Sequence, residues 1–419
     1  MAKTSRPQSL CILASLLFAA VTLPALGEDW PQFLGPRRNG IAMEKNLIDA
    51  WPKRGLPEAW RVDGGVGMSG LVVADGRAIT LWQDEDDQMV VALAADTGKL
   101  LWKTPIAPAF RNTMGNGPRS TPTIDGPLVF AYTGEGVLAA VKVADGALAW
   151  KHEVLDELDA NQADYGMACS PLVVGDLVVV ATGAPGASLM AFDKTTGKVK
   201  WQSGNDSAGY SSPALLELNG VKQIVAFTGE SAIGLVPSSG EPLWRYPFKT
   251  EYDCNVITPL AIDSKVFISA GENRGSVLLE LAKGPDGLKP REHWSSLGNK
   301  SALRAEWQTP LLVDGCLYAF DNVGRAGPVT NLVCLDAATG KQLWMERRFG
   351  KGNATYADGK LFIATMVGEI VVVRADPHGY VELGREALMG GSRQAPTIVD
   401  GRLYVRDNRE VICLDVRKK

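Results

Sequence analysis

The sequence has little of the material from which metal and nucleophilic sites are usually built. Only three histidines occur, His152, His293 and His378, and their spacing fits neither a zinc site nor a catalytic triad. The six cysteines include no CxxC motif and no adjacent pair. A phosphate-binding loop, an HExxH motif and a nucleophile elbow are also missing. We therefore expect no catalytic residues and no metal site of these kinds.

Long apolar runs are missing too, except near the N-terminus. Residues 10–23 form an apolar run that follows Lys3 and Arg6 and leads to the small residues "ALG" before Glu28. This run is shorter than the roughly 20 residues that span a bilayer, and its flanks are typical of a secretory signal peptide. We expect residues 1–27 to be cleaved, the protein to be periplasmic or extracellular, and no membrane span to remain.

Basic residues are not in excess. The formal net charge is −4, and residues 1–27 contain two basic residues and no acid, so the mature chain carries −4 − 2 = −6. This charge disfavours a nucleic-acid partner, because binding to phosphate groups needs a basic surface. Five cysteines remain in the mature chain. Cys316 and Cys334 lie in neighbouring predicted strands and could pair if the register allows, although buried free thiols are the expected state.

What the chain does contain is a repeated phrase. The stretch "DAATGKQLW" at 336–344 recurs as "AADTGKLLW" at 94–102 and "FDKTTGKVKW" at 192–201, with looser copies at 143–150 and 238–244. The tryptophans at this place lie 42 to 51 residues apart, a period typical of a four-stranded propeller blade. The seven tryptophans at this place are Trp60, Trp102, Trp150, Trp201, Trp244, Trp294 and Trp344.

Each unit contains the pattern of four strands. Alternating, β-branched runs are separated by Gly, Asp and Pro turns, as in 120–150 and 170–201, and a Ser/Thr-Pro pair often opens the unit. The last unit, 394–415, supplies only three strands, and the segment with Trp60 supplies the fourth. We predict an all-β protein, an eight-bladed β-propeller of four-stranded antiparallel blades whose last blade is closed by the N-terminal strand. Seven blades fit the spacing nearly as well.

The phrase itself has a physical interpretation. Its glycine permits the positive φ of a tight turn, and its Asp can accept hydrogen bonds from turn N–H groups. The tryptophan lies on the outer strand and can bury about 150–250 Å² against the neighbouring blade. We therefore interpret the seven tryptophans as a structural girdle. In the seventh unit, Leu383 stands at the tryptophan place, four residues after Gly379.

Three segments follow from these patterns: the signal peptide over 1–27, an N-terminal strap over 28–56, and the propeller over 57–419. We expect Trp30, Phe33 and Trp51 of the strap to pack on the propeller, so a truncation that starts at Leu56 should lose stability.

The phrase Ala-x-Asp-x-x-x-Gly-Lys-x-x-Trp resembles the tryptophan-docking motif of the pyrroloquinoline-quinone (PQQ)-like β-propeller repeat superfamily. The stretch "DWPQFLGPRRNG" at 29–40 resembles the opening of exported planctomycete-type propeller proteins of this kind. The resemblance covers nearly the whole mature chain and implies the propeller fold. It implies two classes of function, quinoprotein dehydrogenases and non-enzymatic propellers such as the barrel-assembly propeller lipoprotein, and leaves the activity open.

In a propeller, the loops that join the outermost strand of one blade to the innermost strand of the next gather around the channel on one face. These loops vary and are polar, with an acidic sector that includes Asp156, Glu157, Asp159, Asp206 and Glu251. The candidate residues of this binding face are Arg111, Arg119, Asp164, Tyr165, Asn205, Tyr210, Asp253, Arg304 and Arg393.

Our leading hypothesis is an exported, non-catalytic propeller that binds a protein of the cell envelope or a small ligand through this face, as a monomer and without a cofactor. The alternative is a PQQ- and Ca²⁺-dependent quinoprotein dehydrogenase that oxidises alcohols. Asp164, Asn205 and Asp253 could supply oxygen ligands in that case, but the adjacent Cys-Cys pair of related alcohol dehydrogenases is absent. A third hypothesis is a structural role in envelope protein assembly, although Cys11 lacks the preceding small residue of a lipoprotein site.

Overall fold

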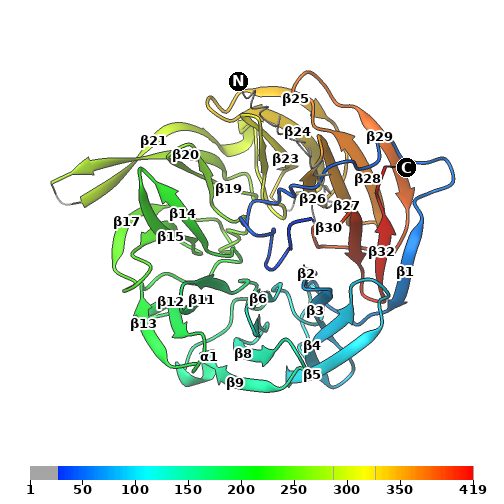
Figure 1. The fold of residues 1–419 in the computed structure, drawn as a ribbon. Helices are drawn as coiled ribbons and strands as arrows, with labels where there is room; N and C mark the ends of the chain where they lie inside the picture. The colour runs from blue at the N-terminus through cyan, green and yellow to red at the C-terminus, as the bar shows by residue number, and fades with distance from the viewer. Residues whose placement is uncertain (1–26, 286, 326, 419) are drawn as a thin grey trace, which may run out of the picture.

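Eight sheets form a closed ring (Figure 1). The computed structural model describes residues 27–285, 287–325 and 327–418, so the predicted signal peptide lies outside the described residues except for Gly27. Each sheet is antiparallel and has four strands, and the sheets stand like blades around a central axis. The prediction of an eight-bladed propeller is confirmed, and the alternative of seven blades is wrong.

Within each blade the strands follow one another from the inside of the ring to the outside. Blades 1 to 4 contain β2 (Val72–Ala74), β3 (Arg77–Gln83), β4 (Asp87–Ala94) and β5 (Leu100–Pro108); β6 (Thr123–Asp125), β7 (Leu128–Tyr132), β8 (Val137–Lys142) and β9 (Leu148–Glu153); β10 (Leu172–Val174), β11 (Leu177–Ala184), β12 (Ala187–Asp193) and β13 (Val199–Ser203); and β14 (Ala214–Leu218), β15 (Val221–Phe227), β16 (Ser231–Leu235) and β17 (Pro242–Pro247).

Blades 5 to 7 repeat this order, and blade 8 combines the two ends of the chain. These blades contain β18 (Leu260–Ile262), β19 (Lys265–Ala270), β20 (Gly275–Gly284) and β21 (Gly287–Leu297); β22 (Leu311–Val313), β23 (Cys316–Val323), β24 (Val329–Asp336) and β25 (Gln342–Glu346); β26 (Gly352–Ala357), β27 (Lys360–Thr365), β28 (Glu369–Arg374) and β29 (Glu382–Ala387); and β30 (Thr397–Val399), β31 (Arg402–Arg406), β32 (Glu410–Asp415) and β1 (Glu58–Asp63). A short helix α1 (Val154–Glu157) and a 3₁₀ turn η1 (Gly298–Lys300) lie in the loops.

Blade 8 closes the ring as the sequence predicts. Strand β1 pairs antiparallel with β32, and Trp60 lies opposite Cys413. The outer edge of β32 would otherwise be open to pairing with another chain. No described helix is long and apolar enough to cross a membrane.

The girdle tryptophans contact the glycine turn of the following blade. Trp294 on β21 covers Gly340, where an added Cβ would come within 2.8 Å of the indole. Its Nε1 donates a hydrogen bond to the carbonyl oxygen of Ala337 at 3.1 Å. The same type of hydrogen bond to a backbone carbonyl of the next blade is made by Trp60, Trp102, Trp150, Trp201 and Trp344. The glycine of the repeated phrase therefore serves two purposes, a positive φ and room for the preceding blade's indole.

Trp244 departs from this pattern because the next blade has no short glycine turn. In blade 5, β20 and β21 form a long hairpin that projects out of the ring (Figure 1). The indole Nε1 of Trp244 donates instead to the side-chain oxygen of Gln223 in its own blade, at 2.5 Å. The girdle is thus interrupted where the hairpin leaves the ring.

In blade 7 the structure corrects the prediction that Leu383 occupies the tryptophan position. The register pairs Val372 with Gly384, so Gly384 stands at the tryptophan position and Leu383 is the bulge residue before it. The connection between β28 and β29 is longer than that between β24 and β25, which moves the position along the chain. The N–H of Trp51 donates to the carbonyl of Leu383 at 2.9 Å, and a Cβ on Gly384 would lie 1.8 Å from the Cβ of Trp51. The strap therefore brings an indole to the strand that lacks its own.

The girdle contact can be tested with two glycines of similar backbone conformation. Gly340 has φ 69° and lies under Trp294, whereas Gly359 has φ 76° and no atom within 4 Å of an added Cβ. Gly359→Ala should cost only the strain of a positive φ, about 1–2 kcal/mol. Gly340→Ala should cost about 1–3 kcal/mol more, because the methyl group displaces the indole. The midpoint of urea unfolding measures both, and equal losses would refute the contact.

The strap runs across the middle of the ring, where Figure 1 draws it in dark blue. The backbone of Trp30 pairs with Val73 of β2 through hydrogen bonds of 2.7 and 2.9 Å, and its side chain is 3% exposed. Further along, Leu47 is fully buried, and Ile48 donates a backbone hydrogen bond to Val416. This segment therefore contacts the first and last blades at once.

Arg38 fixes the strap from the other side of the axis. This arginine is 3% exposed and donates to the carbonyl oxygens of Ser170 and Pro171, both at 3.0 Å, and of Pro213 at 2.9 Å. These carbonyls stand just before the innermost strands of blades 3 and 4. Burial lowers the pKa of Arg38 to about 10, which keeps it charged at neutral pH. One side chain of the strap therefore ties down the starts of two blades.

Candidate functional site

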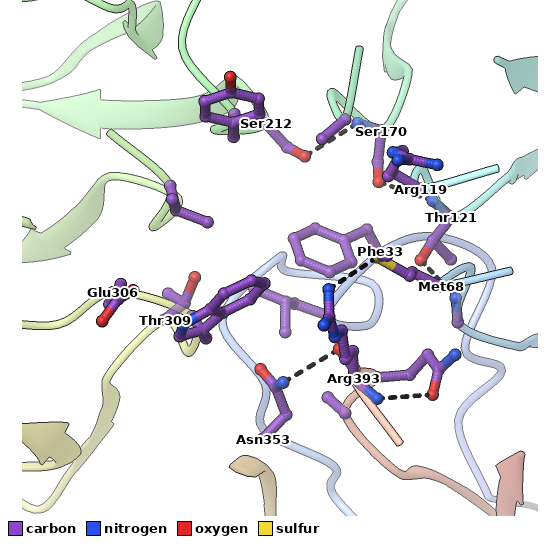
Figure 2. A pocket seen from close by; sticks show the side chains of 18 of the residues that line it. Phe33, Met68, Arg119, Thr121, Ser170, Ser212, Glu306, Thr309, Asn353 and Arg393 are labelled. Atoms are coloured by element: carbon purple, nitrogen blue, oxygen red, sulfur yellow. Dashed lines mark hydrogen bonds between the residues drawn. The ribbon is translucent and has the colours of Figure 1, made fainter. Parts of the chain in front are cut away.

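A cavity of about 390 Å³ lies on the axis of the ring, among the loops that lead from outer to inner strands. Its floor is made by the strap residues Trp30, Phe33 and Leu34. The ring of Phe33 stands near the middle of the cavity, between Arg393 and the side that carries Arg119 (Figure 2). The strap thus shapes the site as well as supporting the blades.

Hydroxyl groups of the Ser/Thr-Pro pairs form part of the cavity wall and join neighbouring blades. Thr121 Oγ1 accepts a hydrogen bond from Gly70 N at 3.0 Å, and Ser170 Oγ accepts one from Thr121 N at 2.9 Å. Ser212 Oγ accepts the next one from Ser170 N at 2.9 Å (Figure 2). The proline that follows each hydroxyl residue in blades 2 to 4 directly precedes the innermost strand. This wall is a chain of hydrogen bonds that runs from blade to blade.

Arg119 lines the cavity with a half-buried guanidinium. It donates to the carbonyl oxygens of Tyr165 at 2.7 Å, of Gly115 at 2.6 Å and of Gly117, and it lies over the ring of Phe110 at 4.4 Å. Burial, with a contribution from the charge of Arg393, lowers its pKa to about 10. Within the described chain, Arg119 forms no ion pair with a carboxylate.

Arg393 lies on the same cavity and stacks on an indole. Its Nη1 donates to the carbonyl of Met114 at 2.8 Å and approaches the sulfur of Met68 at 3.6 Å, and its guanidinium lies over Trp307 at 5.0 Å. Burial lowers the pKa of Arg393. No carboxylate in the described part of the chain pairs with it.

Two predicted tyrosines also lie here. Tyr165 and Tyr210 both line the cavity, with ring centroids 5.5 Å apart and planes at 31°. The hydroxyl of Tyr210 accepts a hydrogen bond from the backbone N–H of Tyr165 at 3.2 Å. Burial raises the pKa of Tyr210, so this phenol stays protonated at neutral pH.

The cavity lining also includes the acidic residues Glu272 and Glu306. Burial raises the pKa of Glu306. The positive charge of Lys351, whose Nζ lies 3.5 Å from Oε1 of Glu306, acts in the other direction and lowers it. Glu272 lies nearby and accepts a backbone hydrogen bond from Glu251 at 2.8 Å. Cys254 also lines the cavity, and burial followed by the charge of Glu272 raises the pKa of its thiol. This thiol is therefore protonated and a poor nucleophile at neutral pH.

Two predicted arginines do not reach the cavity. Arg304 is 5% exposed and forms a two-pronged ion pair with Asp321, at 2.8 and 2.7 Å. Arg111 is exposed in its loop. Arg304 is thus a structural residue of blade 6.

The predicted oxygen ligands are also apart from the cavity lining. Asp164 is exposed, and its backbone carbonyl accepts a hydrogen bond from Asn112. The side-chain oxygen of Asn205 accepts one from Gly186 at 2.8 Å, and Asp253 accepts one from Ser207 at 2.9 Å. Among the described residues no group of three or more His, Cys, Asp or Glu side chains is placed to hold a metal ion. These three residues therefore do not form the calcium set considered from the sequence.

Two other residues of the acidic sector make local contacts. Asp206 is buried and accepts hydrogen bonds from Thr228 at 2.8 Å, from Ser231 and from Arg245 at 2.9 Å. Glu157 contacts His152 at 3.0 Å.

The five cysteines in the described range, at 169, 254, 316, 334 and 413, are all free thiols, including the pair in blade 6.

Several residues of the cavity escaped the sequence reasoning. Trp307 stands in the loop 297–308 that was singled out, where an aromatic residue outside the repeated phrase was the available signal. Phe33 belongs to the strap, and no periodicity places it in the channel. Met68 precedes the first blade and lies outside the loops that were considered.

An eight-bladed ring whose blades are joined by docked tryptophans is the architecture of a PQQ-like β-propeller. The chain matches the family described as outer membrane protein assembly factor BamB over residues 58–163, 86–322 and 326–418, and it belongs to that family. The outer membrane protein assembly factor BamB of Yersinia pestis is 24% identical over 332 residues, which cover 76% of this chain and 67% of that protein.

Solved structures give the same fold. The structure of BamB from Moraxella catarrhalis has a TM-score of 0.62 at 15% identity and covers 86% of this chain and 99% of its own. The quinohemoprotein alcohol dehydrogenase ADHIIG of Pseudomonas putida HK5 has a TM-score of 0.65 at 15% identity, over 93% of this chain and 80% of its own. Likeness at this identity establishes the architecture, and the function must come from the residues of the site.

Proposed function

We propose that the protein is an exported, non-catalytic propeller that binds a protein of the cell envelope or a small ligand at the central cavity of the loop face. One observation carries this proposal: Arg119 and Arg393 are half-buried on one cavity, and neither has a carboxylate partner in the described chain. A partly buried cation without a counter-ion loses hydration free energy. An anionic group of a bound molecule would recover it.

The polar groups of the cavity favour binding over catalysis. Catalysis by a side-chain hydroxyl needs a neighbouring base that accepts its proton. The lining hydroxyls of Thr121, Ser170 and Ser212 accept hydrogen bonds from backbone N–H groups, and none of them, among the described residues, bonds to a histidine or carboxylate. The remaining lining thiol, Cys254, is held protonated.

Family membership supports a role in the cell envelope. The matching family and the Yersinia pestis relative carry the name outer membrane protein assembly factor BamB, and the sequence pattern of residues 1–27 supports export. We therefore propose a periplasmic or extracellular monomer that meets its partner in envelope protein assembly.

The quinoprotein alternative has weaker support. Likeness to an alcohol dehydrogenase structure supports the fold that PQQ enzymes use. However, the oxygen donors proposed for Ca²⁺ do not fit the group, because Asp164, Asn205 and Asp253 do not line the cavity. We therefore derive no reaction through this cofactor.

Site-specific photocross-linking tests which face binds. A photoreactive residue at Arg111 lies on the exposed loop face, and one at Leu148 lies at the start of β9, the end of that strand away from the loops. In envelope extracts we expect defined adducts from position 111 and none from position 148. Adducts from position 148 alone would overturn the proposal. Charge reversal at Asp164 and Asp253 tests the acidic sector separately. Unchanged adducts from position 111 in these variants would exclude the acidic sector from binding.

A further inference from the structure

Two guanidinium groups line the cavity and bind the same loop. Arg119, from the start of blade 2, donates to the carbonyl of Gly115 at 2.6 Å, and Arg393, from the start of blade 8, donates to the carbonyl of Met114 at 2.8 Å. Both cations are therefore anchored to the same loop, and the charge of Arg393 contributes to the lowered pKa of Arg119, although Phe33 stands between the two side chains (Figure 2). Two like charges on one cavity repel each other, and a bound anion would offset this repulsion.

The donors left over on Arg393 suit a carboxylate. Only Nη1 of Arg393 donates within the described residues, so Nε and Nη2 remain available. These two nitrogens form the parallel fork that binds both oxygens of a carboxylate. The stacking on Trp307 at 5.0 Å holds the plane of the fork. Arg119 already donates three of its five N–H groups to backbone carbonyls. It therefore contributes positive charge to the site and does not offer a free fork to the ligand.

The surroundings of the fork suit a flat apolar body. Phe33 stands beside Arg393 in the cavity (Figure 2), and Trp307 lies under the guanidinium. The tyrosine pair Tyr165 and Tyr210 continues the aromatic lining. Aromatic rings prefer offset or edge contacts with other rings, so such a pocket favours an aromatic ligand over an aliphatic one of the same volume.

We propose that the cavity binds an aromatic carboxylate, with the carboxylate on the fork of Arg393 and the ring against Phe33 and Trp307. This inference rests on the proposed function, because it names the ligand chemistry of the same cavity. A free arylalkanoic acid and the C-terminal aromatic residue of a peptide both present this chemistry. A cationic ligand is excluded from the fork by the two guanidinium groups.

Calorimetric titration of the mature protein tests the chemistry with three probes. These are 3-phenylpropionate, its neutral analogue 3-phenylpropanol, and acetate, which has the charge without the ring. We expect 3-phenylpropionate to bind at least about tenfold more tightly than either other probe, a difference of about 1.4 kcal/mol. Equal affinity of the acid and the alcohol, or no binding of the acid, would overturn the proposal.

Variants connect the binding to the fork. Arg393→Gln should weaken the acid at least about tenfold and leave the alcohol unchanged, because the amide lacks the charge and the fork. Arg393→Lys, which keeps the charge but loses the fork, should recover only part of the affinity. Arg291→Gln is the matched control, since this arginine is exposed on the projecting hairpin of blade 5 and does not line the cavity, and it should change nothing. Melting curves confirm that each variant is folded, and full affinity in a folded Arg393→Gln protein would refute the assignment.

A peptide ending in phenylalanine, as free acid and as amide, distinguishes the two sources. Tighter binding of the peptide acid than of 3-phenylpropionate identifies a peptide terminus, and the reverse order identifies a free acid. The two proposals fail separately. Cross-links from position 111 without any binding of these acids would refute the ligand class and leave the binding face intact, whereas their joint absence would refute both.

Discussion

Removal of residues 28–55 is expected to lower the melting temperature of the propeller by more than about 10 °C or to prevent folding. The side chains of Trp30, Leu34, Leu47 and Ile48 are at most 8% exposed in the folded protein. Burial of side chains of this size stabilises a protein by about 1.5–3 kcal/mol each, so the four together contribute on the order of 6–12 kcal/mol. This is comparable with the whole stability of a typical domain, about 5–15 kcal/mol. Scanning calorimetry of the truncated and mature chains measures the difference.

A chain that starts at Glu28 is the control for that experiment, because it keeps the whole strap. Addition of residues 28–55 as a separate peptide should restore part of the lost stability, in proportion to its concentration. An unchanged melting temperature in the truncated chain would show that the strap lies on the propeller without supporting it.

Arg38→Ala is expected to destabilise the protein by about 3–5 kcal/mol, whereas Arg37→Ala should change the free energy of unfolding by less than about 1 kcal/mol. Arg38 donates to three buried carbonyl oxygens, which lose their partner in the variant. Arg37 is exposed and pairs with Glu28 at 2.8 Å, and exposed ion pairs contribute about 0–1 kcal/mol. Guanidinium chloride unfolding of these two adjacent variants measures the contrast.

Arg38→Lys separates charge from geometry. A lysine ammonium cannot match the planar guanidinium that reaches the carbonyls of Ser170, Pro171 and Pro213. The loss of stability in Arg38→Lys should therefore be smaller than the loss in Arg38→Ala, but greater than zero. Equal losses for Arg37→Ala and Arg38→Ala would contradict the role assigned to the buried guanidinium.

The fold could be predicted because its determinants are local and repeated. Glycine, the turn Asp and the tryptophan of each phrase lie within ten residues, and the same contacts recur around the ring. Where a unit differs in length from the other units, counting residues from the glycine no longer finds the tryptophan position. The longer connection in blade 7 moved the tryptophan position from Leu383 to Gly384, and only the register of β28 with β29 reveals it.

The candidate site could be predicted only in part, for a physical reason. Tyr165, Tyr210, Arg119 and Arg393 line the cavity, and each stands shortly before an innermost strand, which carries it toward the axis. Side chains elsewhere in these loops take directions set by distant partners. Arg304 turns to Asp321 of β23, a contact that no spacing in the sequence announces.

The pairing of β1 with β32 also has a consequence for the order of events during synthesis. Arg61 and Glu410 are neighbours in blade 8 although 349 positions separate them along the chain. Contacts of this separation form late, because the intervening loop must close first. A growing chain therefore carries an unpaired first strand β1 until its last strand leaves the ribosome. During that interval the exposed strand edges are open to aggregation, so a holding chaperone would have the most to protect just before translation ends.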